Sequence, residues 1–78
     1  MYKVETIMIF ENECPINFTH SIREAYTMLK TYKEEDKKRK TKNNYVCKLI
    51  EESENSIFYS KVKLYKRNET YFMKKVNI

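Results

Sequence analysis

The chain contains no glycine, no tryptophan and one proline, Pro15, among its 78 residues. Phosphate-binding loops, dinucleotide-binding turns and the strained turn that carries the nucleophile of α/β-hydrolases all need glycine, because they require positive φ or a close approach of the backbone. These three enzyme classes are therefore close to excluded. Alanine is represented by Ala25 alone, whereas Lys, Asn, Ile, Tyr and Glu are abundant, a bias typical of AT-rich genomes.

Long hydrophobic runs are also missing. The longest, IMIF at residues 7–10, is far shorter than the ~20 residues that span a bilayer. The N-terminal segment contains Glu5 and has no small-residue cleavage site, so it does not match a signal peptide. We expect no membrane contact and a cytoplasmic location, in the host cell if the gene is viral. Cys14 and Cys47 are then expected to be reduced thiols.

Zinc-binding and catalytic motifs are absent as well. Cys14, His20 and Cys47 lack the paired spacings that organise a zinc site. Cys14 and His20 could form a nucleophile pair, but no oxyanion donor or orienting group can be assigned to it. We expect no metal, no cofactor and no enzymatic activity. A thiol enzyme remains an alternative that would require a low pKa for Cys14.

The composition predicts one folded domain, residues 1–78, because 41% of the residues are hydrophobic and the chain is too short for a second core. Its net charge of +5 is unevenly distributed. Residues 1–36 carry four basic and seven acidic groups, a net −3, and residues 37–78 carry twelve basic and four acidic groups, a net +8. The C-terminal half should therefore attract acidic partners.

Hydrophobic periodicity predicts the order β-α-β-β-β. Residues 2–12 have apolar side chains on both faces, which favours a central strand, and residues 11–19 are predicted to form a loop because of Pro15. A helix over residues 20–38 begins with a capping box of Ser21 and Glu24. Strands follow at 45–51, 56–67 and 70–78. The expected fold is α+β, with one helix packed on a four-stranded, largely antiparallel sheet.

The last two strands are predicted to form a hairpin whose turn is Arg67 and Asn68. In that register Leu64 faces Tyr71, Val62 faces Met73 and Lys61 faces Lys74. If the helix covers Val62 and Leu64, the opposite face exposes a mixture of basic and aromatic side chains. The candidate partner-binding residues on this face are Tyr59, Lys61, Lys63, Tyr65, Arg67, Phe72 and Lys74.

A basic run at the end of the helix, Lys37, Lys38, Arg39 and Lys40, would add electrostatic support. Both groups also have ordinary interpretations. Tyrosine and lysine are common on the solvated side of a sheet, and basic runs are common at helix ends. Exposed strand edges without Gly or Pro also allow a homodimer.

Two hypotheses for function follow. In the first, the protein is a small non-enzymatic binder that docks its basic half on an acidic protein surface of a larger complex. In the alternative, the same face binds RNA or single-stranded DNA by stacking and phosphate contacts. In size, codon bias and lack of enzymatic motifs the chain resembles small early proteins of bacteriophages, which commonly inhibit a host nucleic-acid-handling or defence complex. No individual residue is carried over from this resemblance.

Overall fold

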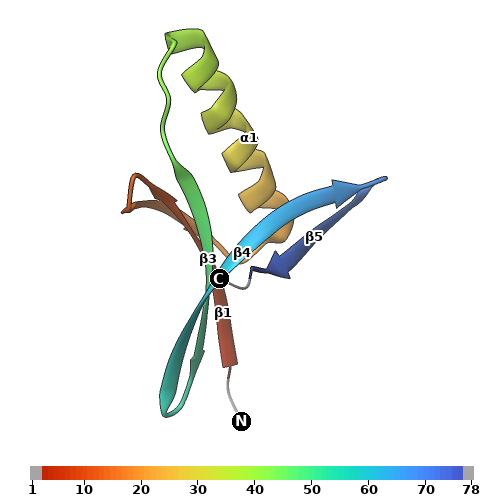
Figure 1. The fold of residues 1–78 in the computed structure, drawn as a ribbon. Helices are drawn as coiled ribbons and strands as arrows, with labels where there is room; N and C mark the ends of the chain where they lie inside the picture. Colours follow the sequence, from red (N-terminus) through yellow and green to blue (C-terminus); the bar gives the residue numbers. More distant parts are fainter. Residues whose placement is uncertain (1–2, 77–78) are drawn as a thin grey trace.

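The computed structural model describes residues 3–76 and shows an α+β fold (Figure 1). The sheet is antiparallel, with the strand order β2-β1-β3-β4-β5, and helix α1 packs on one of its faces. Within residues 3–76, no helix is long and apolar enough to cross a membrane. The elements are β1 (Lys3–Glu11), β2 (Cys14–Thr19), α1 (Ile22–Arg39), β3 (Tyr45–Ser53), β4 (Ser56–Arg67) and β5 (Thr70–Lys75).

The sheet has a fifth strand that was not predicted, because residues Cys14–Thr19 form β2 where a loop was expected at 11–19. It pairs with β1 as an outer strand, where the missing N–H of Pro15 leaves no ladder hydrogen bond unmade on the inner side of the sheet. The pairing shifts by one residue between Ile9 and Phe10, which absorbs the irregularity next to Pro15. β1 consequently lies between β2 and β3, in agreement with its predicted central position.

The turn between β1 and β2 is Asn12 and Glu13, both with positive φ (49° and 73°). Two-residue hairpin turns of this kind usually contain glycine, because a side chain at positive φ costs free energy. Asn12 is held in place by Asn44, whose backbone N–H donates to the Asn12 side chain at 3.0 Å. Its own backbone N–H donates to the carbonyl of Asn44 at 2.8 Å. The turn is therefore tied to the segment that precedes β3.

Helix α1 begins as predicted at Ser21, whose hydroxyl accepts a hydrogen bond from the backbone N–H of Glu24 at 3.2 Å. The second half of the predicted capping box is not formed. The Glu24 carboxylate instead accepts from the Thr19 hydroxyl at 2.6 Å, and this hydroxyl accepts from the backbone N–H of Ser21 at 3.1 Å. Thr19 thereby links the end of β2 directly to the start of the helix.

The helix ends at Lys40, which adopts the left-handed conformation usually taken by glycine (φ 57°). Asp36 connects this end to the segment before β3, because its carboxylate accepts from Thr41 at 3.1 Å and from Asn43 at 3.2 Å. Desolvation opposes ionisation of Asp36, but hydrogen bonds from Tyr45, Thr41 and Asn43 outweigh it and lower its pKa. The helix is thus attached to the sheet at both ends by polar contacts.

The core is one layer of side chains between α1 and the sheet. Ile9 and Ala25 are fully buried at its centre, and Leu29, Tyr32 and Leu64 pack around them. The remaining buried hydrophobic residues come from the three central strands: Ile7, Cys47, Leu49 and Val62.

Strand β4 is long enough to pair with two different partners along its length. Ser56–Val62 pair with β3, and Val62–Arg67 pair with β5. The β4–β5 hairpin therefore projects away from β1 and β3 (Figure 1). Helix α1 contacts this projection through Tyr26, whose ring meets that of Tyr71 edge-on at 5.3 Å.

The register of the β4–β5 hairpin differs from the prediction by two residues. The turn is Asn68 and Glu69, with Arg67 opposite Thr70 and Leu64 opposite Met73. Asn68 supplies the positive φ (56°) from the first turn position instead of the second. A shift of two residues leaves each side chain on its predicted face, because the side-chain period of a strand is two. The predicted faces are therefore right although the facing partners are not.

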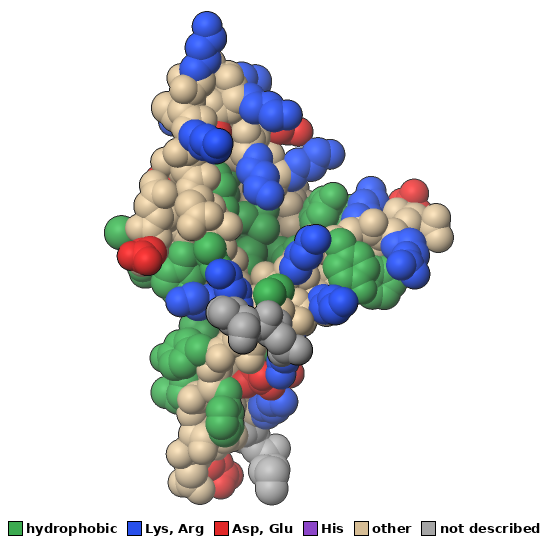
Figure 2. All heavy atoms as spheres, in the orientation of Figure 1, with side chains coloured by type: hydrophobic (Ala, Val, Ile, Leu, Met, Phe, Trp, Pro, Cys, Tyr) green, Lys and Arg blue, Asp and Glu red, His purple; other side chains and the backbone are tan. Residues whose placement is uncertain are grey.

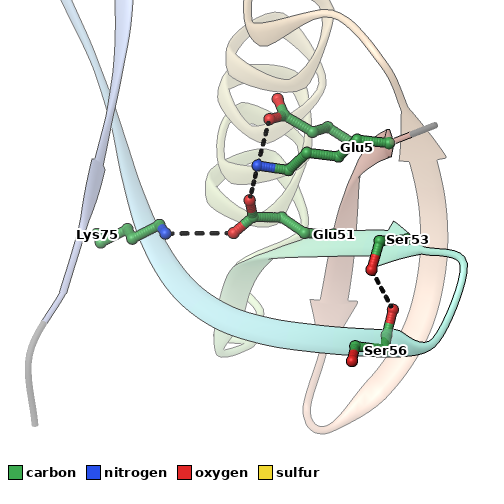
Figure 3. Close-up of polar contacts among 6 residues, drawn as sticks. Glu5, Glu51, Ser53, Ser56 and Lys75 are labelled. Atoms are coloured by element: carbon green, nitrogen blue, oxygen red, sulfur yellow. Dashed lines mark hydrogen bonds and ion pairs between the residues drawn. The ribbon is translucent and has the colours of Figure 1, made fainter. Parts of the chain in front are cut away.

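The carboxylate of Glu51 in β3 links three strands on the side of the sheet that the helix covers (Figure 3). Lys3 of β1 lies 2.7 Å from one carboxylate oxygen and Lys75 of β5 lies 3.2 Å from the other. Hydrogen bonds from Lys3 and then Lys75 lower the pKa of Glu51. Since its folded pKa lies below the ordinary value of 4.5, Glu51 stabilises the fold above that pH, and the contribution is lost as pH falls further.

We predict that Glu51→Gln lowers the unfolding midpoint at pH 7 and flattens the loss of stability between about pH 5 and pH 3, because the amide cannot titrate. Thermal unfolding monitored by circular dichroism across this pH range measures both effects. Glu52→Gln is the matched control, since Glu52 is the next residue and its side chain lies on the other face. Equal acid sensitivity of the Glu51→Gln variant and the wild type would contradict the role of Glu51.

We also predict that Glu13→Gly raises the free energy of unfolding by about 1 kcal/mol, because it removes a side chain from a left-handed position. For a domain of this size the corresponding rise in Tm is roughly 4–8 °C. Glu54→Gly is the control, because Glu54 lies in the β3–β4 turn without positive φ. If Glu13→Gly destabilises the protein as Glu54→Gly does, the left-handed conformation of Glu13 does not lower the stability of the wild type.

Candidate functional site

The face of the sheet that α1 does not cover is the candidate site, and we call it the open face. Side chains alternate between faces along a strand, and directly opposite residues on neighbouring strands share a face. Because Ile9 and Val62 lie under the helix, their sequence neighbours point to the open face. It carries Val4, Thr6, Met8, Phe10, Phe18, Val46, Lys48, Ile50, Glu52, Ile57, Tyr59, Lys61, Lys63, Tyr65, Arg67, Thr70, Phe72 and Lys74.

All seven strand residues selected from the sequence lie on the open face. On β4 and β5 they form cross-strand pairs, with Tyr65 opposite Phe72 and Lys63 opposite Lys74. Figure 2 shows Lys and Arg side chains around hydrophobic side chains on the projecting β4–β5 hairpin. The structure therefore brings this set together, and its role in binding stays a prediction. The set is Tyr59, Lys61, Lys63, Tyr65, Arg67, Phe72 and Lys74.

Four lysines of the open face form two pairs of directly opposite residues. Lys48 faces Lys61 between β3 and β4, and Lys63 faces Lys74 between β4 and β5. The predicted juxtaposition of Lys61 and Lys74 is therefore wrong, and the new register gives two like-charge pairs in place of one. Within residues 3–76, no carboxylate lies at ion-pair distance from any of these four ammonium groups.

Lys48 is the functional candidate that the sequence analysis missed. Its Nζ lies 4.7 Å from the centroid of the Phe10 ring, a cation–π contact that draws it along the open face away from Lys61. The signal was in the segment YVCKLIE, where Lys48 alternates with buried Cys47 and Leu49. To infer that Lys48 lies beside Lys61, however, one needs the register of β3 against β4, and side-chain alternation alone does not give it.

The aromatic side chains of the open face differ in how much surface they leave free. Tyr65 and Phe72 stack on each other, with ring centroids 5.2 Å apart and an interplanar angle of 19°, and each remains about a third exposed (37% and 36%). Tyr59 is 66% exposed and stands next to the Lys48–Lys61 pair. Phe18, 60% exposed, lies across the sheet on β2. The open face therefore offers free aromatic surface beside unneutralised cations.

A shallow hollow of about 510 Å³ lies where β4 leaves β3 on this face. Its floor is apolar, from Phe10 and Val46, and Lys48, Tyr59 and Lys61 stand around it. Glu13 of the β1–β2 turn is the acidic residue at its wall. The complete lining is Phe10, Glu13, Asn44, Val46, Lys48, Tyr59, Ser60 and Lys61.

The basic run at the helix end does not join the open face. It forms the last turn and cap of α1, which packs on the opposite face of the sheet. In Figure 2 these basic side chains gather at the top of the molecule, where Figure 1 places the end of α1. They belong to a separate basic region, made of Lys37, Lys38, Arg39 and Lys40.

The cysteines and the histidine are not brought together. Cys14 and His20 lie at opposite ends of β2, with Cys14 opposite Glu11. The Nδ1 atom of His20 lies 2.8 Å from the Glu5 carbonyl oxygen. No group of three His, Cys, Asp or Glu side chains suited to a metal occurs in residues 3–76. Cys47 is buried in the core, where desolvation raises the pKa of its thiol from 9.0 to about 11.

Comparison with protein-family models, curated proteins and solved structures found no match to this chain.

We predict that the buried thiol makes the fold sensitive to alkaline pH. Below pH 9 Cys47 is neutral in both states, but between about pH 9 and 11 the unfolded thiol ionises and the folded one does not, so roughly 2 kcal/mol of stability is lost. Urea unfolding at pH 8 and pH 11 should show a smaller loss for Cys47→Ala than for the wild type. Cys14→Ser, which alters the exposed thiol, is the control and should lose as much as the wild type. An unchanged alkaline loss in Cys47→Ala would contradict the assignment.

Proposed function

We propose that the protein is a non-enzymatic binding protein that docks its open face on an acidic surface of a larger protein complex. The main support for the proposal is that two cross-strand pairs of lysines, Lys48–Lys61 and Lys63–Lys74, lie on a sheet face that the helix does not cover. Like charges directly opposite each other on neighbouring strands destabilise a sheet. An acidic partner would neutralise these lysines and relieve the repulsion, which would favour the complex over the free protein.

The hydrophobic side chains around the lysines favour a protein partner. Ile57 is 55% exposed and Val76 42%, and neither side chain can stack on a base. Such aliphatic residues, next to Tyr59 and Tyr65, are typical of the centre of a protein–protein interface. The lysines would then surround an apolar contact and select a partner of opposite charge.

The class of partner follows from the chain as a whole. With a net charge of +8 in residues 37–78, the protein would be drawn to complexes that expose acidic surfaces. In keeping with its resemblance to small early phage proteins, the proposed partner is a host nucleic-acid-handling or defence complex, and docking would inhibit it. The basic region at the end of α1 would add attraction at longer range without forming the contact.

A second candidate function is supported by Tyr59. Its ring is the most exposed large aromatic surface of the open face and stands beside Lys48 and Lys61, at the apolar hollow. A base of RNA or single-stranded DNA could stack there while the two lysines contact phosphates, a contact worth ~1–3 kcal/mol per base. Binding of this kind would quench tyrosine fluorescence and weaken steeply between low and physiological salt.

The test is capture from a lysate of the native host, divided into nuclease-treated and untreated halves. We predict that the wild type retains one stoichiometric protein after nuclease and that the double variant Lys61→Glu, Lys63→Glu loses it. The same variant should be at least as stable as the wild type, because each substitution turns a like-charge pair into an opposite-charge pair, worth roughly 0.2–1 kcal/mol.

Lys37→Glu, Lys38→Glu is the matched control, with the same change in net charge at the helix end. It should keep capturing the partner. Equal capture by the open-face variant and the wild type would remove the open face as the binding site. Loss of every captured protein upon nuclease treatment would replace the protein partner by nucleic acid.

A further inference from the structure

One stretch of strand edge in this sheet is left without a described partner. β4 pairs with β3 along Ser56–Val62, but β5 accompanies it only from Val62 onward, with one more bond from the Val76 N–H to the Lys61 carbonyl at 2.8 Å. Among residues 3–76, nothing pairs with the outer side of Ser56–Ser60. Since Lys61 points its carbonyl to the β5 side, Ile57 and Tyr59 point their backbone groups the same way, by the alternation of an antiparallel ladder.

This edge is also unusually apolar. Ile57, Phe58 and Tyr59 are consecutive and 55%, 60% and 66% exposed, and no residue of Ser56–Ser60 is charged. Figure 2 shows hydrophobic side chains on the surface of the lower part of the molecule, where Figure 1 places the β3–β4 hairpin. An uncharged, hydrophobic edge of this kind readily pairs with another strand.

The other edges of the sheet are protected. The outer strand β2 is short and contains Pro15, and β5 is short and ends in Lys74 and Lys75. At the free edge of β1, the His20 side chain lies against the Glu5 carbonyl. These are ordinary means of preventing strand addition. Ser56–Ser60 is also short, but it contains neither proline nor lysine. The contrast indicates that this edge is the one open to pairing.

The sequence of the edge is complementary to itself. When SIFYS (56–60) is paired antiparallel with a second copy about Phe58, Ser56 faces Ser60, Ile57 faces Tyr59 and Phe58 faces Phe58. Ile57 and Tyr59, which carry the outward backbone groups, become hydrogen-bonded pairs, and Phe58 becomes the non-hydrogen-bonded pair on the twofold axis. Pairing about Phe58 therefore satisfies both the outward backbone groups and the alternation of side chains.

We propose that the protein forms a homodimer in which the Ser56–Ser60 edges of two copies pair antiparallel about Phe58. The two sheets become one continuous sheet, with Ile57 packed on Tyr59 of the second copy on the open face and the two Phe58 rings in contact on the other. Pairing about a twofold axis uses both edges and stops at two copies.

The first test is the mass of the full chain in solution, by analytical ultracentrifugation over a range of concentrations. We expect a dimer for the wild type and a monomer for Ile57→Lys, which introduces like charges on both sides of the new ladder. Phe72→Lys is the matched control, because it adds a lysine at another exposed hydrophobic position away from this edge, and it should remain a dimer. Circular dichroism checks that all three proteins are folded.

The second test fixes the register by disulfide formation in a Cys14→Ser background, which removes the exposed native thiol. Facing residues of a non-hydrogen-bonded pair have Cα atoms about 4.5 Å apart, within the disulfide range, so Phe58→Cys should give a covalent dimer upon mild oxidation. Ser56→Cys is the control on the same edge. The two Ser56 positions are about 14 Å apart in this register, so it should crosslink at least tenfold more slowly.

A monomeric wild type at every concentration would overturn the proposal. Equal crosslinking of Phe58→Cys and Ser56→Cys, or an unchanged dimer mass for Ile57→Lys, would overturn this interface. A wild type that is monomeric alone but captures a different protein through Ile57 would identify that edge as a heterologous site, and the homodimer would be wrong. Partner capture is measured separately by Lys63→Glu alone, because Lys63 lies outside the Ser56–Ser60 edge: loss of capture with an unchanged dimer mass separates the open-face site from the homodimer.

Discussion

The packing of α1 on one face of the sheet, around Ile9 and Ala25, is the contact on which the rest of the structure depends. It removes from water the one layer of side chains that forms the described core, and shortening a residue such as Ile9 to alanine would cost about 2–5 kcal/mol. In a chain of 78 residues so little core leaves a small margin of stability. The polar contacts of Thr19, Asp36 and Glu51 hold the helix ends and the outer strands to this layer.

One helix can cover only one face of a five-stranded sheet, so the opposite face stays open. Exposed apolar surface and unneutralised lysines on this face both lower the stability or solubility of the free protein. Glu13 and Lys40 adopt the left-handed conformation in a chain without glycine, which also lowers the stability of the fold. The exposed apolar side chains and the unneutralised lysines lie together on the open face, which is the physical basis for the proposal that this face binds a partner. In the proposed homodimer, the uncharged edge Ser56–Ser60 pairs with a second copy beside that surface.

Much of this arrangement could be predicted from the sequence. The alternation of Val62 and Leu64 with Lys61 and Lys63 assigns the faces of β4, and Ser21 marks the start of the helix. These signals are local and depend only on the period of each element, so they survive errors in pairing. That is why a register error of two residues in the β4–β5 hairpin left every side chain on its predicted face.

The missed features depend on contacts that are distant in sequence. β2 was predicted as a loop because Pro15 is unfavourable in a strand, and only its place at the edge of the sheet makes it acceptable. Lys48 gains its meaning from Lys61, thirteen residues later, and from Phe10 on another strand. The free edge Ser56–Ser60 exists because β4 changes partner at Val62, which no local pattern records.

Binding of acidic partners by the open face can be measured by titrating ¹⁵N-labelled protein with poly-L-glutamate and following the amide resonances. We expect shifts concentrated at Lys48, Tyr59, Lys61, Lys63 and Lys74, with little change along α1. Shifts confined to the end of α1 around Lys37–Lys40, with the open face unchanged, would contradict it.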